Sequence, residues 1–289
     1  MPSRLIRMAA IAVLTTLTAL TATSCADGGG GGGGGADAKT SPAAAASPHS
    51  DGKGGKAEKK EGVHWGYEGA EAPMNWASLA EDFEACEAGH EQSPIDLADA
   101  KAAEAPADKA ITIDYEPVTA ELVNNGHTVQ ANVSAGGGIV VDGTSYDLKQ
   151  FHFHLPSEHT EEGRHTAMEL HFVHADKNGG LAVVGVLMDE KAGASAFADL
   201  FKKLPPKEGA PVKITQAFDL TAFLPGDRDQ YRYGGSLTTP PCTEGVKWTV
   251  LKDPVRVAPA EVAAYKAMFP KGNRPTQPLN ERKLTVVDK

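Results

Sequence analysis

The sequence predicts one folded domain that is mainly β with short helices, an α+β class, organised around a large, mostly antiparallel twisted β-sheet. Short segments in which apolar and polar residues alternate recur from residue 111 onward, and turns rich in glycine or asparagine separate them. Helical periodicity is sparse by comparison. The 289 residues, 41% of them hydrophobic and 23% charged, have the composition of an ordinary globular protein.

The first 24 residues have the pattern of an export signal. Arg4 and Arg7 precede an apolar run over residues 8–20, which is too short for a stable membrane span but has the length of a signal-peptide core. Small residues then lead to Cys25. This arrangement resembles a bacterial lipoprotein signal, in which that cysteine is lipidated, although Ala22 departs from the leucine most common at its position. The alternative is an ordinary secreted protein cleaved nearby.

Glycine, alanine, serine, proline and lysine dominate residues 25–60. Such a segment buries too little apolar surface to offset the entropy of ordering, so we expect a flexible tether. The tether would connect a domain at residues 61–289 to the outer face of a bacterial cell membrane, or belong to a secreted or periplasmic protein. The net charge of -10, without a basic patch in the domain, argues against nucleic acid as a partner.

Cys86 and Cys242 are the two cysteines of the predicted domain. In an exported protein, two cysteines so far apart in the sequence favour one disulfide. Closing so long a loop contributes at most about 5 kcal/mol in the chain-entropy model. Two buried free thiols are the alternative.

The predicted domain opens at residues 63–67, continues through a short helix or turns over 74–86, and has an extended segment at 92–96. Asparagine and glycine tolerate positive φ, so we expect a turn at residues 124–126. Helical spacing predicts helices over 194–204 and, after Pro259, over 261–269. The predicted strands are 111–115, 121–123, 127–129, 139–141, 150–154, 167–173, 181–187 and 230–236.

The segment at residues 150–154 carries the first candidate for chemistry. Side chains two residues apart on a strand share a face, so His152 and His154 project together. A later segment has Glu169 two residues before His171, where the carboxylate can accept the N–H of that imidazole. Three neutral imidazoles leave a bound Zn²⁺ with its full charge and an open coordination position, which suits the activation of water.

Two other interpretations of these histidines are open at this point. A His-x-His strand is also found where polar residues lie on a solvated sheet face, although the two intervening phenylalanines argue for burial of the opposite face. His152, His154 and Glu158 also fit the first metal motif of cupins, small β-barrels in which that glutamate is a ligand. Cupins take their last histidine from a distant second motif, and no histidine follows His174.

Six motifs together resemble the α-class carbonic anhydrases, and the likeness extends from residue 64 to about residue 282. They occur in the order Gln92-Ser93-Pro94-Ile95-Asp96, Asn124-Asn125-Gly126-His127, Ser157-Glu158-His159-Thr160, Glu169-Leu170-His171, Ser236-Leu237-Thr238-Thr239-Pro240-Pro241 and Asn273-Arg274-Pro275-Thr276-Gln277-Pro278-Leu279. The resemblance implies zinc-dependent, reversible hydration of carbon dioxide to bicarbonate and a proton, by attack of a zinc-bound hydroxide.

The same resemblance implies roles for the histidines and their neighbours. The expected zinc ligands are His152, His154 and His171. Gln150 and Glu169 are expected to hydrogen-bond behind two of them.

Three further residues are expected to take part in catalysis. Thr238 would accept a hydrogen bond from the zinc-bound hydroxide while donating its own proton to Glu158, and His127 would carry the product proton to solvent. If the resemblance is set aside, the alternative interpretation is that Glu158 is a surface glutamate in a polar turn and that His127 is an exposed turn histidine.

The resemblance also implies an apolar pocket for carbon dioxide, a water network and a disulfide. Tyr67 is expected in the water network, and Cys86 and Cys242 match a disulfide of bacterial members. The expected pocket residues are Val173, Val183, Leu237, Thr239, Val246 and Trp248. We expect a monomer, and the alternative from another class is a catalytically silent surface binding module with the same fold.

Overall fold

The structure is a computed structural model that describes residues 63–98 and 101–288. The predicted signal peptide, Cys25 and the tether lie outside these residues. No helix within the described residues is long and apolar enough to cross a membrane.

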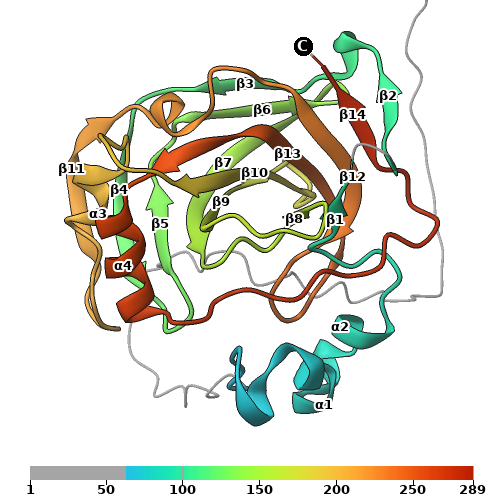
Figure 1. Cartoon of the computed structure of the whole chain (residues 1–289), viewed down its shortest axis with the longest axis horizontal. Coiled ribbons are helices and arrows are strands. Elements are labelled where there is room, and N and C mark those ends of the chain that lie inside the picture. The colour runs from blue at the N-terminus through green and yellow to red at the C-terminus, as the bar shows by residue number, and fades with distance from the viewer. Residues whose placement is uncertain (1–62, 99–100, 289) are drawn as a thin grey trace, which may run out of the picture. The chain divides into compact units, whose positions relative to one another are not determined.

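A twelve-stranded sheet forms the body of the domain (Figure 1). Its strands are β2 (Ala103–Ala105), β3 (Thr112–Tyr115), β4 (Val118–Asn124), β5 (Val129–Val133), β6 (Gly137–Val141), β7 (Thr144–His154), β9 (Met168–Ala175), β10 (Leu181–Glu190), β11 (Val212–Phe218), β12 (Gln230–Ser236), β13 (Glu244–Val257) and β14 (Thr285–Val287). Two short strands, β1 (Asp96–Leu97) and β8 (Thr160–Glu161), pair separately.

The strand order is β11-β4-β5-β7-β9-β10-β13-β12-β14-β2, with β3 and β6 paired beside β7. Most neighbours are antiparallel, whereas β10 with β13 and β14 with β2 are parallel. The predicted fold class is therefore confirmed. The sequence analysis did not delimit the strands β2, β11, β13 and β14. In β13, Gly245 and Pro254 interrupt the apolar pattern, and Pro254 lies where the register with β10 shifts.

The helices are short. They are η1 (Gly69–Glu71), η2 (Pro73–Asn75), α1 (Trp76–Leu79), η3 (Glu81–Phe83), α2 (Ala85–Ala88), η5 (Ala107–Lys109), α3 (Ala198–Phe201), η6 (Leu220–Phe223) and α4 (Pro259–Met268). The helix α4 confirms the prediction over 261–269. The helix predicted over 194–204 is a single turn, α3, with turn hydrogen bonds before and after it, and Pro205 and Pro206 end the segment.

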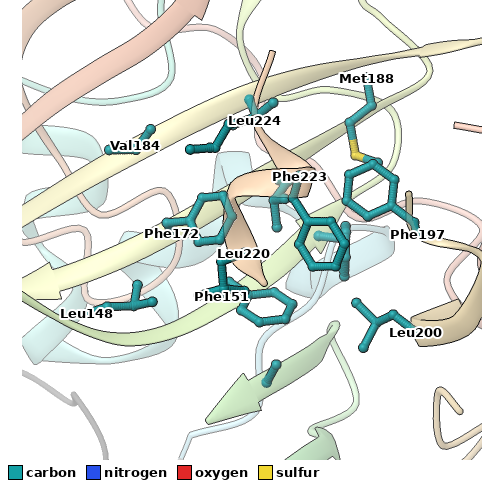
Figure 2. Packing of buried hydrophobic residues seen from close by; sticks show 14 of the residues in the cluster. Leu148, Phe151, Phe172, Val184, Met188, Phe197, Leu200, Leu220, Phe223 and Leu224 are labelled. Carbon is teal, nitrogen blue, oxygen red and sulfur yellow. The ribbon is translucent and has the colours of Figure 1, made fainter. Parts of the chain in front are cut away.

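The two faces of the sheet are buried by different sets of side chains. On β9, Leu170 and Phe172 face the larger core, whereas His171 and Val173 face the other side, as the alternation of a strand requires. In the larger core, the ring of Phe151 lies 5.7 Å from that of Phe172 (Figure 2). Each buried phenylalanine stabilises the fold by about 1.5–3 kcal/mol, so this core holds β7 and β9 firmly enough to carry polar groups on the opposite face.

The predicted disulfide is present between Cys86 on α2 and Cys242 in the loop after β12. Cys242 also donates its backbone N–H to the carbonyl oxygen of Thr239. The bond therefore ties the N-terminal helical segment to the loop that carries Thr238.

Candidate active site

The three predicted ligand histidines come together on neighbouring strands. His152 on β7 pairs directly with His171 on β9, and His154 pairs with Glu169. One ring nitrogen from each of the three histidines lies within 4.8 Å of the others. The period-two interpretation of the segment at 150–154 is thus correct, and the site faces away from the phenylalanine core.

Two of these imidazoles are oriented by the side chains that the sequence predicts. Nδ1 of His152 donates to Oε1 of Gln150 at 2.8 Å, and Nε2 of His171 donates to Oε1 of Glu169 at 2.8 Å. Both acceptors lack a proton to give, so each ring carries its N–H on the bonded nitrogen. The lone pairs that remain are on Nε2 of His152 and Nδ1 of His171.

The third imidazole is oriented by a group that the sequence analysis missed. Nδ1 of His154 donates to the backbone carbonyl oxygen of Gly272 at 2.8 Å, which leaves the lone pair of Nε2 free. A backbone carbonyl has no residue-type signature. Its position just before the motif at residues 273–279 was the one available indication.

All three imidazoles are neutral at pH 7. Burial lowers the pKa of His154 to about 4, and burial likewise holds the pKa values of His152 and His171 below the usual range. Metal binding requires neutral imidazole, so no proton has to be displaced at neutral pH.

Glu169 belongs to a wider buried network. Its Oε2 accepts the backbone N–H groups of Glu158 and His159 at 2.8 Å each, and its Oε1 lies 2.7 Å from Nδ1 of His159. The other nitrogen of His159 lies 2.7 Å from the hydroxyl of Tyr233. His159 is therefore structural, and the cluster of His159, Glu169 and His171 is a hydrogen-bonded network that orients the ligand His171.

Glu158 is completely buried beside the histidines, so the surface interpretation of this residue is wrong. Its Oε1 accepts the backbone N–H of Arg274 at 2.8 Å, and the hydroxyl of Thr238 lies near enough to the carboxylate to favour its charged form. Burial raises the pKa of Glu158 to about 7. Its Oε2 lies 3.4 Å from Nε2 of His154.

A cavity of about 460 Å³ opens in front of the histidines. Most of the predicted pocket and network residues line it, namely Tyr67, Val173, Val183, Leu237, Thr239 and Trp248. Val246 does not line it but packs in the apolar cluster with Val173 and Trp248. The remaining walls include Leu181 and Gln130, which the sequence analysis did not single out.

His127 lines the same cavity at the turn between β4 and β5. Gly126 has a φ of 88°, and Oδ1 of Asn125 accepts the backbone N–H of His127 at 3.0 Å, so the predicted turn is confirmed. The imidazole stacks on Trp65 with ring centroids 3.7 Å apart and planes 8° from parallel. Burial and the neighbouring His64 lower the pKa of His127 below its usual value. Trp65 was not predicted as a site residue.

The model of the eukaryotic-type carbonic anhydrase family matches residues 71–287 of this chain. A carbonic anhydrase from Neisseria gonorrhoeae is 42% identical over 222 residues, which cover 76% of this chain and 86% of the relative. A carbonic anhydrase from Klebsiella pneumoniae is 44% identical over 223 residues, which cover 76% of this chain and 89% of the relative.

Solved structures with this fold agree. The α-carbonic anhydrase from Thermovibrio ammonificans, solved with the inhibitor sulfanilamide, has a TM-score of 0.74 and 41% identity, with 78% of this chain and 99% of that chain covered. Dioscorin, solved in complex with ascorbate, has a TM-score of 0.73 at 30% identity, with 78% and 98% covered. The open sheet, which runs from β11 at one end to β2 at the other, excludes the cupin barrel. The chain therefore belongs to the α class, or eukaryotic type, of carbonic anhydrases.

Proposed function

We propose that this chain is a zinc-dependent carbonic anhydrase that interconverts carbon dioxide with bicarbonate and a proton. The observation that carries the proposal is the convergence of three neutral imidazoles, each with one lone pair free, at the base of the cavity. When bound there, Zn²⁺ lowers the pKa of water towards neutrality and so supplies a nucleophile at neutral pH.

The donor set fits a zinc ion. Within the described residues, Nε2 of His154 and Oε2 of Glu158 are buried atoms without a hydrogen-bond partner. An unsatisfied buried polar atom destabilises a fold by about 1–3 kcal/mol. A cation held by His152, His154 and His171 would satisfy the imidazole and attract the carboxylate.

Thr238 and Glu158 select the ligand that sits above the histidines. When Glu158 is ionised, its carboxylate only accepts hydrogen bonds, so the neighbouring hydroxyl of Thr238 would direct its proton at Glu158. The lone pairs of the Thr238 oxygen remain for the cavity, where they accept a hydrogen bond from a ligand that carries an O–H. This arrangement would hold the nucleophilic oxygen with its own lone pair directed at carbon dioxide.

Carbon dioxide is apolar and needs a wall without strong hydrogen-bond donors. Val173, Val183, Leu237 and Trp248 supply such a wall on one side of the histidines. The ring of Trp248 lies 4.9 Å from that of His171, which places this wall directly beside one ligand. Val246 supports the wall from behind.

His127 is the group we assign to proton transfer. It lines the cavity and is partly exposed, and an imidazole is the side chain that most readily takes and releases a proton at physiological pH. Tyr67 is buried, which raises the pKa of its hydroxyl well above 10, so it stays protonated as a donor to ordered water. Thr239 adds a second hydroxyl to the same cavity.

Stopped-flow measurement of carbon dioxide hydration, with zinc content determined on the same sample, tests the proposal. We expect one zinc per chain and hydration that a sulfonamide inhibits. A chain with one zinc and no sulfonamide-sensitive hydration would instead be the silent binding module. The matched control is His171→Gln, which should lose both zinc and activity.

We also propose that the catalytic domain, residues 61–289, is exported and acts as a monomer. The disulfide supports export, because such bonds form in oxidising compartments. Residues 1–24 would be the signal peptide, Cys25 the lipidated residue and residues 25–60 the tether. Cys25→Ser should release the protein from the membrane fraction, and release of the unaltered protein would refute the anchor.

A further inference from the structure

The residues that line the cavity differ in charge from the protein as a whole. The chain carries 38 acidic and 28 basic residues, with a net charge of -10. Among the described residues, no aspartate or glutamate lines the cavity, and Lys149 is the one lysine or arginine that does. Bicarbonate is an anion, so it approaches a protein that repels it on average and enters a cavity whose lining residues include one lysine and no aspartate or glutamate.

A β-bulge in β7 lies at Lys149. The pairing of β7 with β9 shifts between Leu148 and Gln150, so Lys149 is the extra residue of the longer strand. Before the bulge, the even-numbered Leu148 packs into the phenylalanine core, and after it the odd-numbered Phe151 does. A regular strand would place only one of the neighbours Lys149 and Gln150 on the cavity side, whereas with the bulge both residues line the cavity.

The ammonium group of Lys149 is held but stays exposed. Its Nζ lies 3.2 Å from Oδ2 of Asp147, and the two side chains are 43% and 79% exposed. An exposed pair of this kind is weak and leaves the lysine charge felt nearby. Lys149 lines the cavity and Asp147 does not, so the member of this pair that borders the cavity is the cationic residue.

We propose that Lys149 is an anion-attracting residue that raises the affinity of the cavity for bicarbonate and for small monovalent anions. The proposal rests on the proposed function for its physiological ligand, bicarbonate. The extra residue of the bulge in β7 would then have two effects. It shifts the alternation of side chains along the strand, and it places a cation beside the path of the product.

The expected effect is small and depends on salt. Lys149 precedes His152 by three residues, which is about 10 Å along a strand. Two unit charges at about this distance in water change an affinity by about twofold. The Debye length is about 30 Å at 0.01 M ionic strength and about 3 Å at 1 M, so the effect should be present in dilute buffer and vanish in concentrated salt.

Titration of thiocyanate into the zinc-loaded protein, followed by calorimetry, tests the proposal without relying on turnover. An enzyme cannot change the equilibrium between carbon dioxide and bicarbonate, so any substitution changes kcat/KM for hydration and for dehydration by the same factor. The affinity for an unreactive anion therefore measures the attraction of anions by Lys149 more directly than turnover does. Lys149→Gln should weaken thiocyanate binding about twofold at about 0.01 M ionic strength. Lys149→Arg should retain it, and Asp147→Asn should tighten it.

Lys191 provides a matched control. It pairs with an aspartate two residues earlier, Asp189, at 3.1 Å, as Lys149 pairs with Asp147. It follows the end of β10 ten residues after Leu181, which lines the cavity, so it lies about 30 Å away along the strand. Lys191→Gln changes the net charge equally and should leave thiocyanate affinity unchanged.

Equal effects of Lys149→Gln and Lys191→Gln, or no effect of Lys149→Gln in dilute buffer, would overturn the proposal. Loss of carbon dioxide hydration in the unaltered protein would overturn the proposed function instead. The thiocyanate titration would still report on Lys149 in that case, so the two failures are distinguishable.

Discussion

Removal of the disulfide should destabilise the domain far more than it impairs the site. The bond closes a loop between residues 156 positions apart. In the chain-entropy model, a loop of this length lowers the entropy of the unfolded chain by about 17 cal/mol/K, or about 5 kcal/mol at 25 °C. For a domain of this size, about 1 kcal/mol shifts the Tm by about 2–4 °C, so Cys86→Ser combined with Cys242→Ser should lower the Tm by about 10–20 °C.

Differential scanning calorimetry of the zinc-loaded protein measures this shift. Hydration activity at 25 °C should survive, because Cys242 still donates its backbone N–H to Thr239 and accepts a hydrogen bond from Gln92 at 3.1 Å. The unaltered protein in excess reductant should show the same lower Tm. A shift below about 3 °C would refute the loop-entropy reasoning, because it would mean that the unfolded chain is not restrained by the bond.

Three further predictions concern single side chains. Thr238→Val should lower kcat/KM for hydration by about a hundredfold, with Thr238→Ser close to the unaltered protein, because only a hydroxyl relays the orientation set by Glu158; equal activity of the two variants in stopped-flow assays would contradict this. His127→Ala should lower turnover in weak buffer by about a hundredfold, with recovery on addition of imidazole, and unchanged turnover would reject the shuttle. Burial lowers the pKa of His174 to about 3, against about 6.5 in the unfolded chain, so the stability that neutral His174 contributes is complete above pH 6.5 and is lost as the pH falls towards 3. The free energy of unfolding, measured by urea titration, should therefore fall less between pH 7 and pH 5 in His174→Gln than in the unaltered protein, by up to about 2 kcal/mol. The same fall in both proteins would count against this cause.

The metal-binding face of β7 could be predicted from the sequence because it depends on one local regularity. Side chains alternate along any strand, so His152 and His154 had to share a face whatever the rest of the chain did. The same holds for the turn before His127, since asparagine and glycine favour positive φ locally. The third ligand needed more than periodicity. The motif around His171 identified this residue, rather than His174, as the third ligand. The pairing of His152 with His171 agrees with that choice.

Contacts between distant segments could not be predicted in this way. The carbonyl oxygen of Gly272 orients His154 from 118 residues away, and any residue type could have supplied that oxygen. Trp65 stacks on His127 across a similarly unrelated stretch of sequence. The strand β13 was missed because Pro254 contradicts a strand pattern locally, although the long pairing of β13 with β10 and β12 outweighs that local penalty.

The sequence by itself therefore determined which residues we propose for the chemistry: the three histidines, their two side-chain hydrogen-bond partners, and the pair formed by Thr238 and Glu158. Only the tertiary structure decided how they are held and what surrounds them. It did so because hydrogen bonds to backbone carbonyls, ring stacking and strand register arise from packing between segments far apart in the chain. Lys149 illustrates the difference, since it and its neighbour Gln150 both line the cavity because of a one-residue shift between β7 and β9 that no local pattern records.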